Sequence, residues 1–242
     1  MKIEILYPEI CTLYGDKGNT MYLQKCLPDA EFVTTGLNEK PLFLRENIDM
    51  VYMCSMSEKS QELVLDRLMQ YKEEIAACMK DGKALFLLVG NSMELLGDYI
   101  KREDGTRVTG LGVVPGMYSV RQAVIEAPNR FNTLIKAKFN DMTLIGYTSR
   151  FAHTYGIPED MTFCKVEIGQ GSNPDTMNEG ICKNRVIATY IHGPLLIQNP
   201  DFVHYLLEKL DAPMKEIPFE AAMRKAYDVK LAEYGKPDLE LS

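Results

Sequence analysis

Short apolar runs alternate with segments of helical periodicity over the first hundred residues. The runs span residues 2–7, 30–35, 48–54 and 84–89. The last two are continuously apolar, as strands buried on both faces of a parallel sheet are. Helices are expected from Asn19 to Leu27, where Pro28 ends the pattern, and from Ser57 to Lys80. This alternation predicts an α/β fold, with helices on both faces of a mostly parallel sheet.

The pattern changes between Val108 and Ile168. Short strand-like runs at residues 122–125, 133–139 and 143–147 are separated by turn residues there, and we expect them to form an antiparallel extension. Further on, the sequence predicts a buried strand at 185–191 and helices at 201–210 and 216–234. We expect one domain over residues 1–210 and a C-terminal helical extension, 211–242, packed on it.

Charge and cysteine content exclude several classes of function. A net charge of -7 and a pI near 5.1 argue against nucleic acid, because binding to a phosphate backbone requires clustered Lys and Arg. The six cysteines include no C-x-x-C pair, so we expect reduced thiols and no metal site, and no cofactor is indicated. The N-terminus has no apolar signal-peptide core, and the most apolar run is far shorter than the roughly 20 residues that span a bilayer. The sequence therefore predicts a cytoplasmic protein with no membrane partner.

The fourth apolar run leads through Gly90, Asn91 and Ser92 into a segment that carries Met93, Leu95 and Leu96. A sharp strand-to-helix turn of this kind exposes a nucleophile in many α/β enzymes, and the following helix N-terminus supplies backbone donors. Ligands of open α/β sheets bind outside the carboxyl ends of the strands. The loops after residues 7, 54, 90 and 191 are therefore the expected site.

Two groups of motifs carry a resemblance to a known family. The first is Leu6-Tyr7-Pro8 followed by Leu13-Tyr14-Gly15-Asp16-Lys17-Gly18-Asn19; the second is Glu179-Gly180, Thr189-Tyr190-Ile191-His192-Gly193-Pro194-Leu195-Leu196 and Asn199-Pro200. Both resemble the class I glutamine amidotransferases of the cobyric acid synthase and lipid II isoglutaminyl synthase glutaminase-subunit type. The resemblance implies a flavodoxin-like three-layer sandwich, a Cys-His glutaminase site in which His192 is the catalytic histidine, and a Mur-ligase-like partner protein.

The turn departs from the family pattern. The family reads Cys-Gly-Gly-Tyr-Gln-Leu-Leu-Gly there, which places Gly90 at the nucleophilic cysteine, Asn91 and Ser92 at the two glycines, and Glu94 at the glutamine. Because the family's reaction passes through a thioester, glycine cannot perform it.

Two further loops depart in the same way. Cys54-Ser55-Met56-Ser57-Glu58 stands where the family has a glycine-rich Gly-Gly-Gly-Gln-Asp segment. His153 stands where the resemblance implies a substrate-holding arginine, whose planar fork a histidine cannot reproduce.

Several residues keep two interpretations. Cys54, the one thiol predicted at a strand's carboxyl end, is either a relocated nucleophile facing His192 or a small buried residue, and the second agrees with the usual burial of free cysteine. His192 is a structural or ligand-binding residue, or a general base. Tyr14, Asp16 and Asn19 form a pocket or an interface, or only turn the chain and cap a helix.

The leading hypothesis is an amidotransferase-like protein without glutaminase activity that acts as a binding or partner subunit and binds glutamine or a related small molecule. The alternative is an active glutaminase subunit, with a nucleophile such as Cys54, that supplies ammonia to a cell-wall or cobyrinate-type carboxylate.

Overall fold

A nine-stranded sheet forms the centre of the molecule, which is known from a computed structural model that describes residues 1–122, 131–236 and 239. The strand order is β2-β1-β3-β4-β13-β12-β11-β8-β9. Its parallel part consists of β1 (Lys2–Leu6), β2 (Glu31–Thr35), β3 (Met50–Met53), β4 (Leu85–Val89) and β13 (Val186–Thr189). Its antiparallel part consists of β8 (Phe131–Phe139), β9 (Met142–Arg150), β11 (Thr162–Ile168) and β12 (Asn178–Lys183). The predicted mostly parallel sheet with an antiparallel extension is confirmed.

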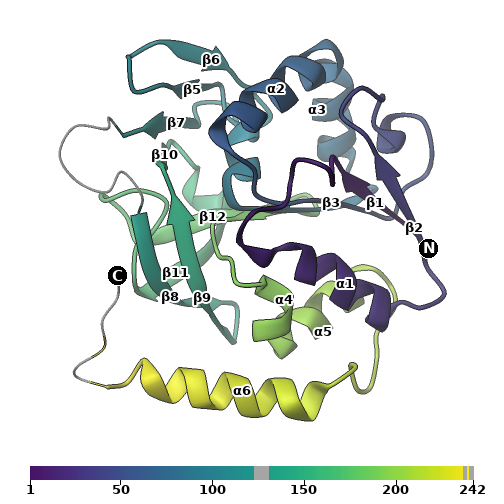
Figure 1. Cartoon of the computed structure of the whole chain (residues 1–242), viewed down its shortest axis with the longest axis vertical. Helices are drawn as coiled ribbons and strands as arrows, with labels where there is room; N and C mark the ends of the chain where they lie inside the picture. Colours follow the sequence, from purple (N-terminus) through teal and green to yellow (C-terminus); the bar gives the residue numbers. More distant parts are fainter. Residues whose placement is uncertain (123–130, 237–238, 240–242) are drawn as a thin grey trace.

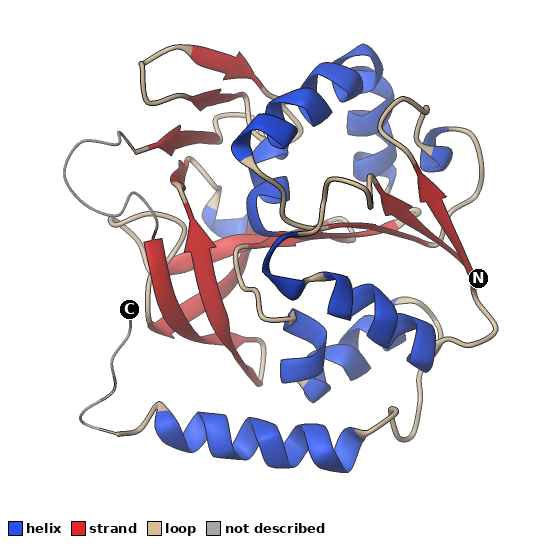
Figure 2. Cartoon of the chain, viewed as in Figure 1, coloured by secondary structure: helices blue, strands red, loops and turns tan. Residues whose placement is uncertain are grey.

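Helices cover both faces of the parallel part (Figures 1 and 2). On one face lie α2 (Glu58–Leu68) and α3 (Lys72–Asp81), and on the other lie α1 (Lys17–Cys26), α4 (Leu195–Gln198) and α5 (Pro200–Lys209). The last helix, α6 (Glu220–Glu233), runs along the outside of this second layer. Strands β3 and β4 are buried at every position, as their continuous apolar sequences predict.

The helix expected at residues 57–80 is wrong in one respect, because the chain forms two α-helices there. A 3-10 turn, η3 (Met69–Tyr71), separates α2 from α3. Ser57 caps α2 by accepting from the Ser60 amide, and Gly82 ends α3 in the left-handed conformation. The break contains no glycine or proline, and the apolar periodicity of the sequence continues through it. The sequence therefore gives no signal that α2 ends there.

A second sheet was not predicted. It has the order β10-β7-β5-β6 and consists of β5 (Tyr99–Lys101), β6 (Arg107–Thr109), β7 (Tyr118–Arg121) and β10 (Ala152–Tyr155). Part of the segment expected to extend the central sheet therefore pairs elsewhere. The run expected at 122–125 lies outside the described residues except for Gln122.

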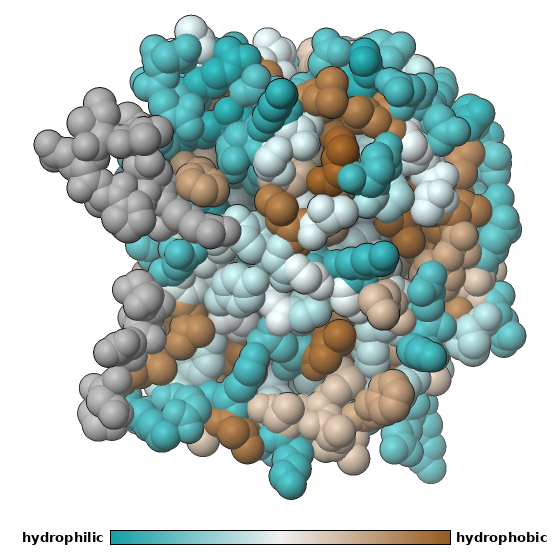
Figure 3. Space-filling view, viewed as in Figure 1, coloured by the Kyte–Doolittle hydropathy of each residue, from teal (hydrophilic) through white to brown (hydrophobic). Residues whose placement is uncertain are grey.

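Short 3-10 segments complete the fold: η1 (Leu13–Gly15), η2 (Leu42–Leu44), η4 (Gly90–Leu96) and η5 (Glu159–Met161). The segment after the predicted turn is thus a 3-10 helix and not an α-helix. His204 Nε2 on α5 lies 3.1 Å from Glu220 Oε1 on α6 and so joins the two helices. On the face shown in Figure 3, apolar residues form several small groups among hydrophilic ones.

Candidate functional site

Adjacent parallel strands bring the predicted loops together. Strands β1, β3, β4 and β13 are neighbours in the sheet, so the segments that leave their carboxyl ends meet at one edge. Gly90 follows β4 and His192 follows β13, as the sequence predicted. Ser55 follows β3 and lies between them, which the sequence analysis did not anticipate.

The Ser55 side chain fills the space beside Gly90. Gly90 has φ +72°, and a Cβ atom built on it would overlap Ser55 Oγ and lie 2.9 Å from Ser55 Cβ and 2.5 Å from His192 Cε1. Real Cβ atoms do not approach other heavy atoms so closely. A side chain at position 90 therefore requires both Ser55 and His192 to move.

Three buried polar side chains meet at this point. His192 Nδ1 lies 2.8 Å from Asp16 Oδ2 and 3.2 Å from Ser55 Oγ, and the Ser55 hydroxyl donates to Asp16 Oδ2 over 3.0 Å. Exposure is 0% for Asp16 and His192 and 1% for Ser55. The Tyr14 ring covers the imidazole, with centroids 4.7 Å apart. The network is closed to solvent.

The three groups do not form a proton relay of the Ser-His-Asp kind. In such a triad the acid binds one imidazole nitrogen and the nucleophile binds the other. Here Asp16 and Ser55 approach the same nitrogen, Nδ1, while Nε2 is buried without a hydrogen-bond partner among the described residues. An Nδ1–H donated to Asp16 Oδ2 and a serine hydroxyl donated to the same oxygen agree with the two shorter distances.

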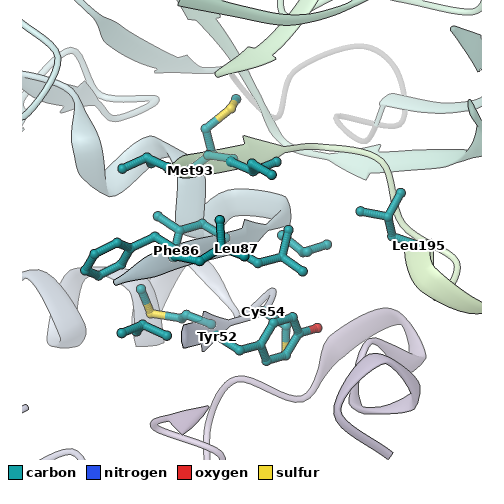
Figure 4. Packing of buried hydrophobic residues seen from close by; sticks show 14 of the residues in the cluster. Tyr52, Cys54, Phe86, Leu87, Met93 and Leu195 are labelled. Carbon is teal, nitrogen blue, oxygen red and sulfur yellow. The ribbon is translucent and has the colours of Figure 1, made fainter. Parts of the chain in front are cut away.

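The Cys54 thiol faces the opening loop. Its Sγ donates to the Cys11 carbonyl over 2.8 Å, and Cys54 packs beside Tyr52 among core side chains (Figure 4). Burial, reinforced by the Asp16 carboxylate, raises the pKa of the thiol to about 12. Because the thiolate is the nucleophilic form, these contacts favour the interpretation of Cys54 as a core residue.

The opening loop is held by its own polar groups. Asn19 is fully buried; its Nδ2 donates to the Tyr52 hydroxyl, and its Oδ1 accepts from the Leu196 amide. Tyr14 has φ +58° inside η1, and its carbonyl accepts from the Tyr147 hydroxyl over 3.4 Å. Asn19 thus serves structure here, while Asp16 and Tyr14 contact His192.

Asn91 and Ser92 bond to the protein itself. Asn91 Oδ1 accepts from the Met56 amide and its Nδ2 donates to the Met56 carbonyl, which fixes the loop that carries Ser55. The Ser92 hydroxyl donates to the Val89 carbonyl over 2.8 Å. Both side chains thus help to hold the turn after β4 in place.

Glu94 belongs to a second buried network. Its carboxylate accepts from Gln61 Nε2 over 3.0 Å and from the Tyr190 hydroxyl over 2.9 Å, and it is 2% exposed. Burial raises the pKa of Glu94. Gln61 also accepts from Arg121, so this network ties α2 to the second sheet. Sequence reasoning placed Gln61 on a helix and gave no signal of its role.

His153 lies on β10, paired with Val120 of β7, and is 3% exposed. Burial, and after it the Arg150 guanidinium, lowers the pKa of His153 to about 4, which keeps the ring neutral at physiological pH. It therefore does not supply the cation that an arginine would supply at this position.

Among the described residues, no group of three or more His, Cys, Asp or Glu side chains could hold a metal ion. Within the same residues, none of the helices has the length and apolar character needed to cross a membrane.

The sequence over residues 2–200 matches the CobB/CobQ-like glutamine amidotransferase domain. The chain belongs to this family. The match covers β1 to the start of α5 and includes every residue of the network around Ser55. This member of the family has a glycine, Gly90, directly after β4.

Two curated relatives of this amidotransferase-like chain are lipid II isoglutaminyl synthase (glutamine-hydrolyzing) subunits GatD. The one from Streptococcus pneumoniae is 25% identical over 240 residues, which are 97% of this chain and 85% of the relative. The one from Staphylococcus aureus is 28% identical over 211 residues, 86% and 83% of the two chains.

Solved structures agree with the class I amidotransferase fold. A glutamine amidotransferase crystal structure gives a TM-score of 0.53 at 13% identity, with 86% of this chain and 98% of that chain covered. A glutamine amidotransferase from Thermotoga maritima gives 0.51 at 12% identity, with 95% and 92% covered. At these identities the likeness concerns the fold alone.

Proposed function

We propose that this chain is a cytoplasmic amidotransferase-like subunit that does not hydrolyse glutamine and acts by binding a partner protein. The observation that carries the proposal is the Ser55 side chain in the space beside Gly90, where the family's reaction requires a thiol. Glutamine hydrolysis through a thioester needs a thiolate within reach of both the substrate and a base. Position 90 has no such group, and the space for one is filled.

The other groups at the site support the same conclusion. Ser55 donates its hydroxyl to Asp16, so it is not activated by His192 as a base. The Cys54 thiol is buried and bonded to a backbone carbonyl, which argues against a relocated nucleophile. The polar groups that would otherwise meet a substrate instead hold loops to one another.

The partner is proposed from the relatives. Both are named as subunits of a synthase, so a role within an assembly is in keeping with the family. We take the partner to be a Mur-ligase-like protein that amidates a cell-wall carboxylate, a choice that the lipid II relatives favour over a cobyrinate substrate. Glutamine or a related small molecule remains a candidate ligand of the chain.

Covalent labelling tests the proposal against an active enzyme that uses Cys54. The native chain is treated with an electrophilic glutamine analogue, and modified residues are mapped by mass spectrometry. We expect no adduct on any cysteine at a time when a glutaminase of known activity is fully labelled. A stoichiometric adduct on Cys54, lost in Cys54→Ala, would overturn the proposal.

A further inference from the structure

A polar pocket lies apart from the network around Ser55. Its volume is about 280 Å³, and it lies among β10, β11, the start of β12 and the segment between β11 and β12. Its lining includes Tyr155, Asn173, Asp175 and Asn178. None of the residues around Gly90 and His192 lines it, so it is independent of the proposed function.

A stack of tyrosines ends at this pocket. Tyr99, Tyr118 and Tyr155 are register partners on adjacent strands β5, β7 and β10. Their ring centroids are 5.1 Å and 5.4 Å apart, with interplanar angles of 14° and 16°. The Arg107 guanidinium closes the first end, 4.1 Å from the Tyr99 centroid.

Among the residues that the structure describes, no cation or further aromatic ring caps the other end of the stack, at Tyr155. Strand β10 is the last strand of its sheet, and the segment at Ser172 lies along its outer edge, where the Thr154 amide donates to the Ser172 carbonyl. Tyr118 covers one face of the Tyr155 ring, and Tyr155 forms part of the pocket wall. Figure 1 shows β10 beside β7. A ligand ring in the pocket would continue the stack by packing on the face of Tyr155 that Tyr118 does not cover.

The polar side chains of the pocket suit hydroxyl groups. Asp175 is exposed, and among the described residues its carboxylate has no hydrogen-bond or ion-pair partner; the same holds for the side-chain amide of Asn178. Asn173 fixes the loop, since its Nδ2 donates to the Thr154 carbonyl and its Oδ1 accepts from the Asp175 amide. Asp175 therefore offers two carboxylate oxygens as acceptors, and Asn178 offers an amide with both donor and acceptor atoms.

We infer that this pocket binds a neutral saccharide. One aromatic face with hydrogen-bonding groups around it matches a pyranose, which has an apolar C–H face and equatorial hydroxyls. A planar base can also stack on a single aromatic face, so adenosine is the competing ligand in the test. The Asp175 carboxylate disfavours phosphorylated and carboxylated ligands, because the two negative charges repel each other.

Saturation-transfer NMR on the full chain tests the inference with glucose, galactose, mannose and N-acetylglucosamine as probes, and adenosine as the competing ring. We expect transfer to the ring protons of at least one saccharide. Tyr155→Ala removes the stacking face and should weaken that binding about tenfold, the equivalent of one aromatic contact. Asp175→Ala, at an exposed position, should weaken it as well without affecting the fold.

Tyr99→Ala is the matched control, because it removes a ring of the same stack at the end closed by Arg107; it should leave binding within about twofold of the native chain. The inference is overturned if none of the four saccharides shows transfer, if only adenosine does, or if Asp175→Ala and a folded Tyr155→Ala both bind as the native chain does.

Discussion

The Ser55 hydroxyl group occupies the position that a side chain on Gly90 would need. The two residues leave adjacent strands β3 and β4, and the Ser55 hydroxyl is held there by its bond to Asp16. The absence of a side chain at Gly90 and the position of the Ser55 hydroxyl are therefore one structural feature. Ser55, Asp16 and His192 are buried there.

Gly90→Ala should destabilise the chain by about 2 kcal/mol more than Gly105→Ala. Gly105 has a similar positive φ of +85° but no atom near its Cβ position, so it controls for backbone strain. Adding Ser55→Gly to Gly90→Ala should recover part of the excess, because the contact of the new Cβ with His192 Cε1 remains. Urea unfolding of the native chain, Gly90→Ala, Ser55→Gly and the double variant gives the coupling energy between positions 90 and 55. Equal losses for Gly90→Ala and Gly105→Ala would show that the space is not filled.

The contact between Ser55 and Gly90 also determines whether a cysteine fits at position 90. Cysteine at position 90 has no room while Ser55 is present, so Gly90→Cys alone should react slowly with an electrophilic glutamine analogue. Gly90→Cys with Ser55→Gly should react at least about tenfold faster, because the thiol then shares the site with His192. The labelling rates are measured by intact-protein mass spectrometry. Equal rates for the two variants would show that the Ser55 side chain does not block position 90.

Glu94→Gln should change how stability depends on pH. Burial raises the pKa of Glu94, so below the ordinary glutamate pKa of about 4.3 the carboxyl is protonated in both folded and unfolded chains. As pH rises through the raised folded-state pKa, the native chain must bury a charge and loses stability. The free energy of unfolding of Glu94→Gln minus that of the native chain should therefore increase from pH 4 to pH 7.

Glu103→Gln, on an exposed loop, is the control for this comparison, and its difference from the native chain should stay flat over the same range. A difference for Glu94→Gln that is flat or falls with pH would mean that the buried carboxylate is better compensated by Gln61 and Tyr190 than burial alone suggests.

The six thiols should differ in reactivity. Cys78 and Cys182 are half-buried, while Cys11, Cys26, Cys54 and Cys164 are buried. Burial also raises the pKa of the Cys54 thiol to about 12, so little thiolate exists at neutral pH. Titration with an aromatic disulfide should modify Cys78 and Cys182 first. Early modification of Cys54, identified by peptide mapping, would contradict its place in the core.

The sequence predicted much of this site because parallel strands leave little freedom. Gly90 and His192 end β4 and β13, which are sheet neighbours, so their meeting followed from two apolar runs and the rule for strand ends. Ser55 lies in the 54–58 loop, which differs from the family pattern, and the sequence alone gave it no role. Its contact with His192 spans 137 positions, and no local pattern specifies such a pair.

Other features have weaker local signals. Strands β5 and β6 have three residues each, too few for an alternation to be recognised, so the second sheet was missed. The break between α2 and α3 contains Met69, Gln70 and Tyr71, all ordinary helix residues. The division at residue 210 and the roles assigned to the site residues stay predictions.

Ammonia release from glutamine tests directly whether the chain hydrolyses glutamine. The full chain is assayed alone and together with a co-purified Mur-ligase-like partner, under conditions in which an active amidotransferase of the same family serves as the positive control. We expect the rate of ammonia release to equal that of the enzyme-free blank, both with and without the partner. Turnover at an ordinary enzymatic rate, about 1 per second or faster, would contradict it.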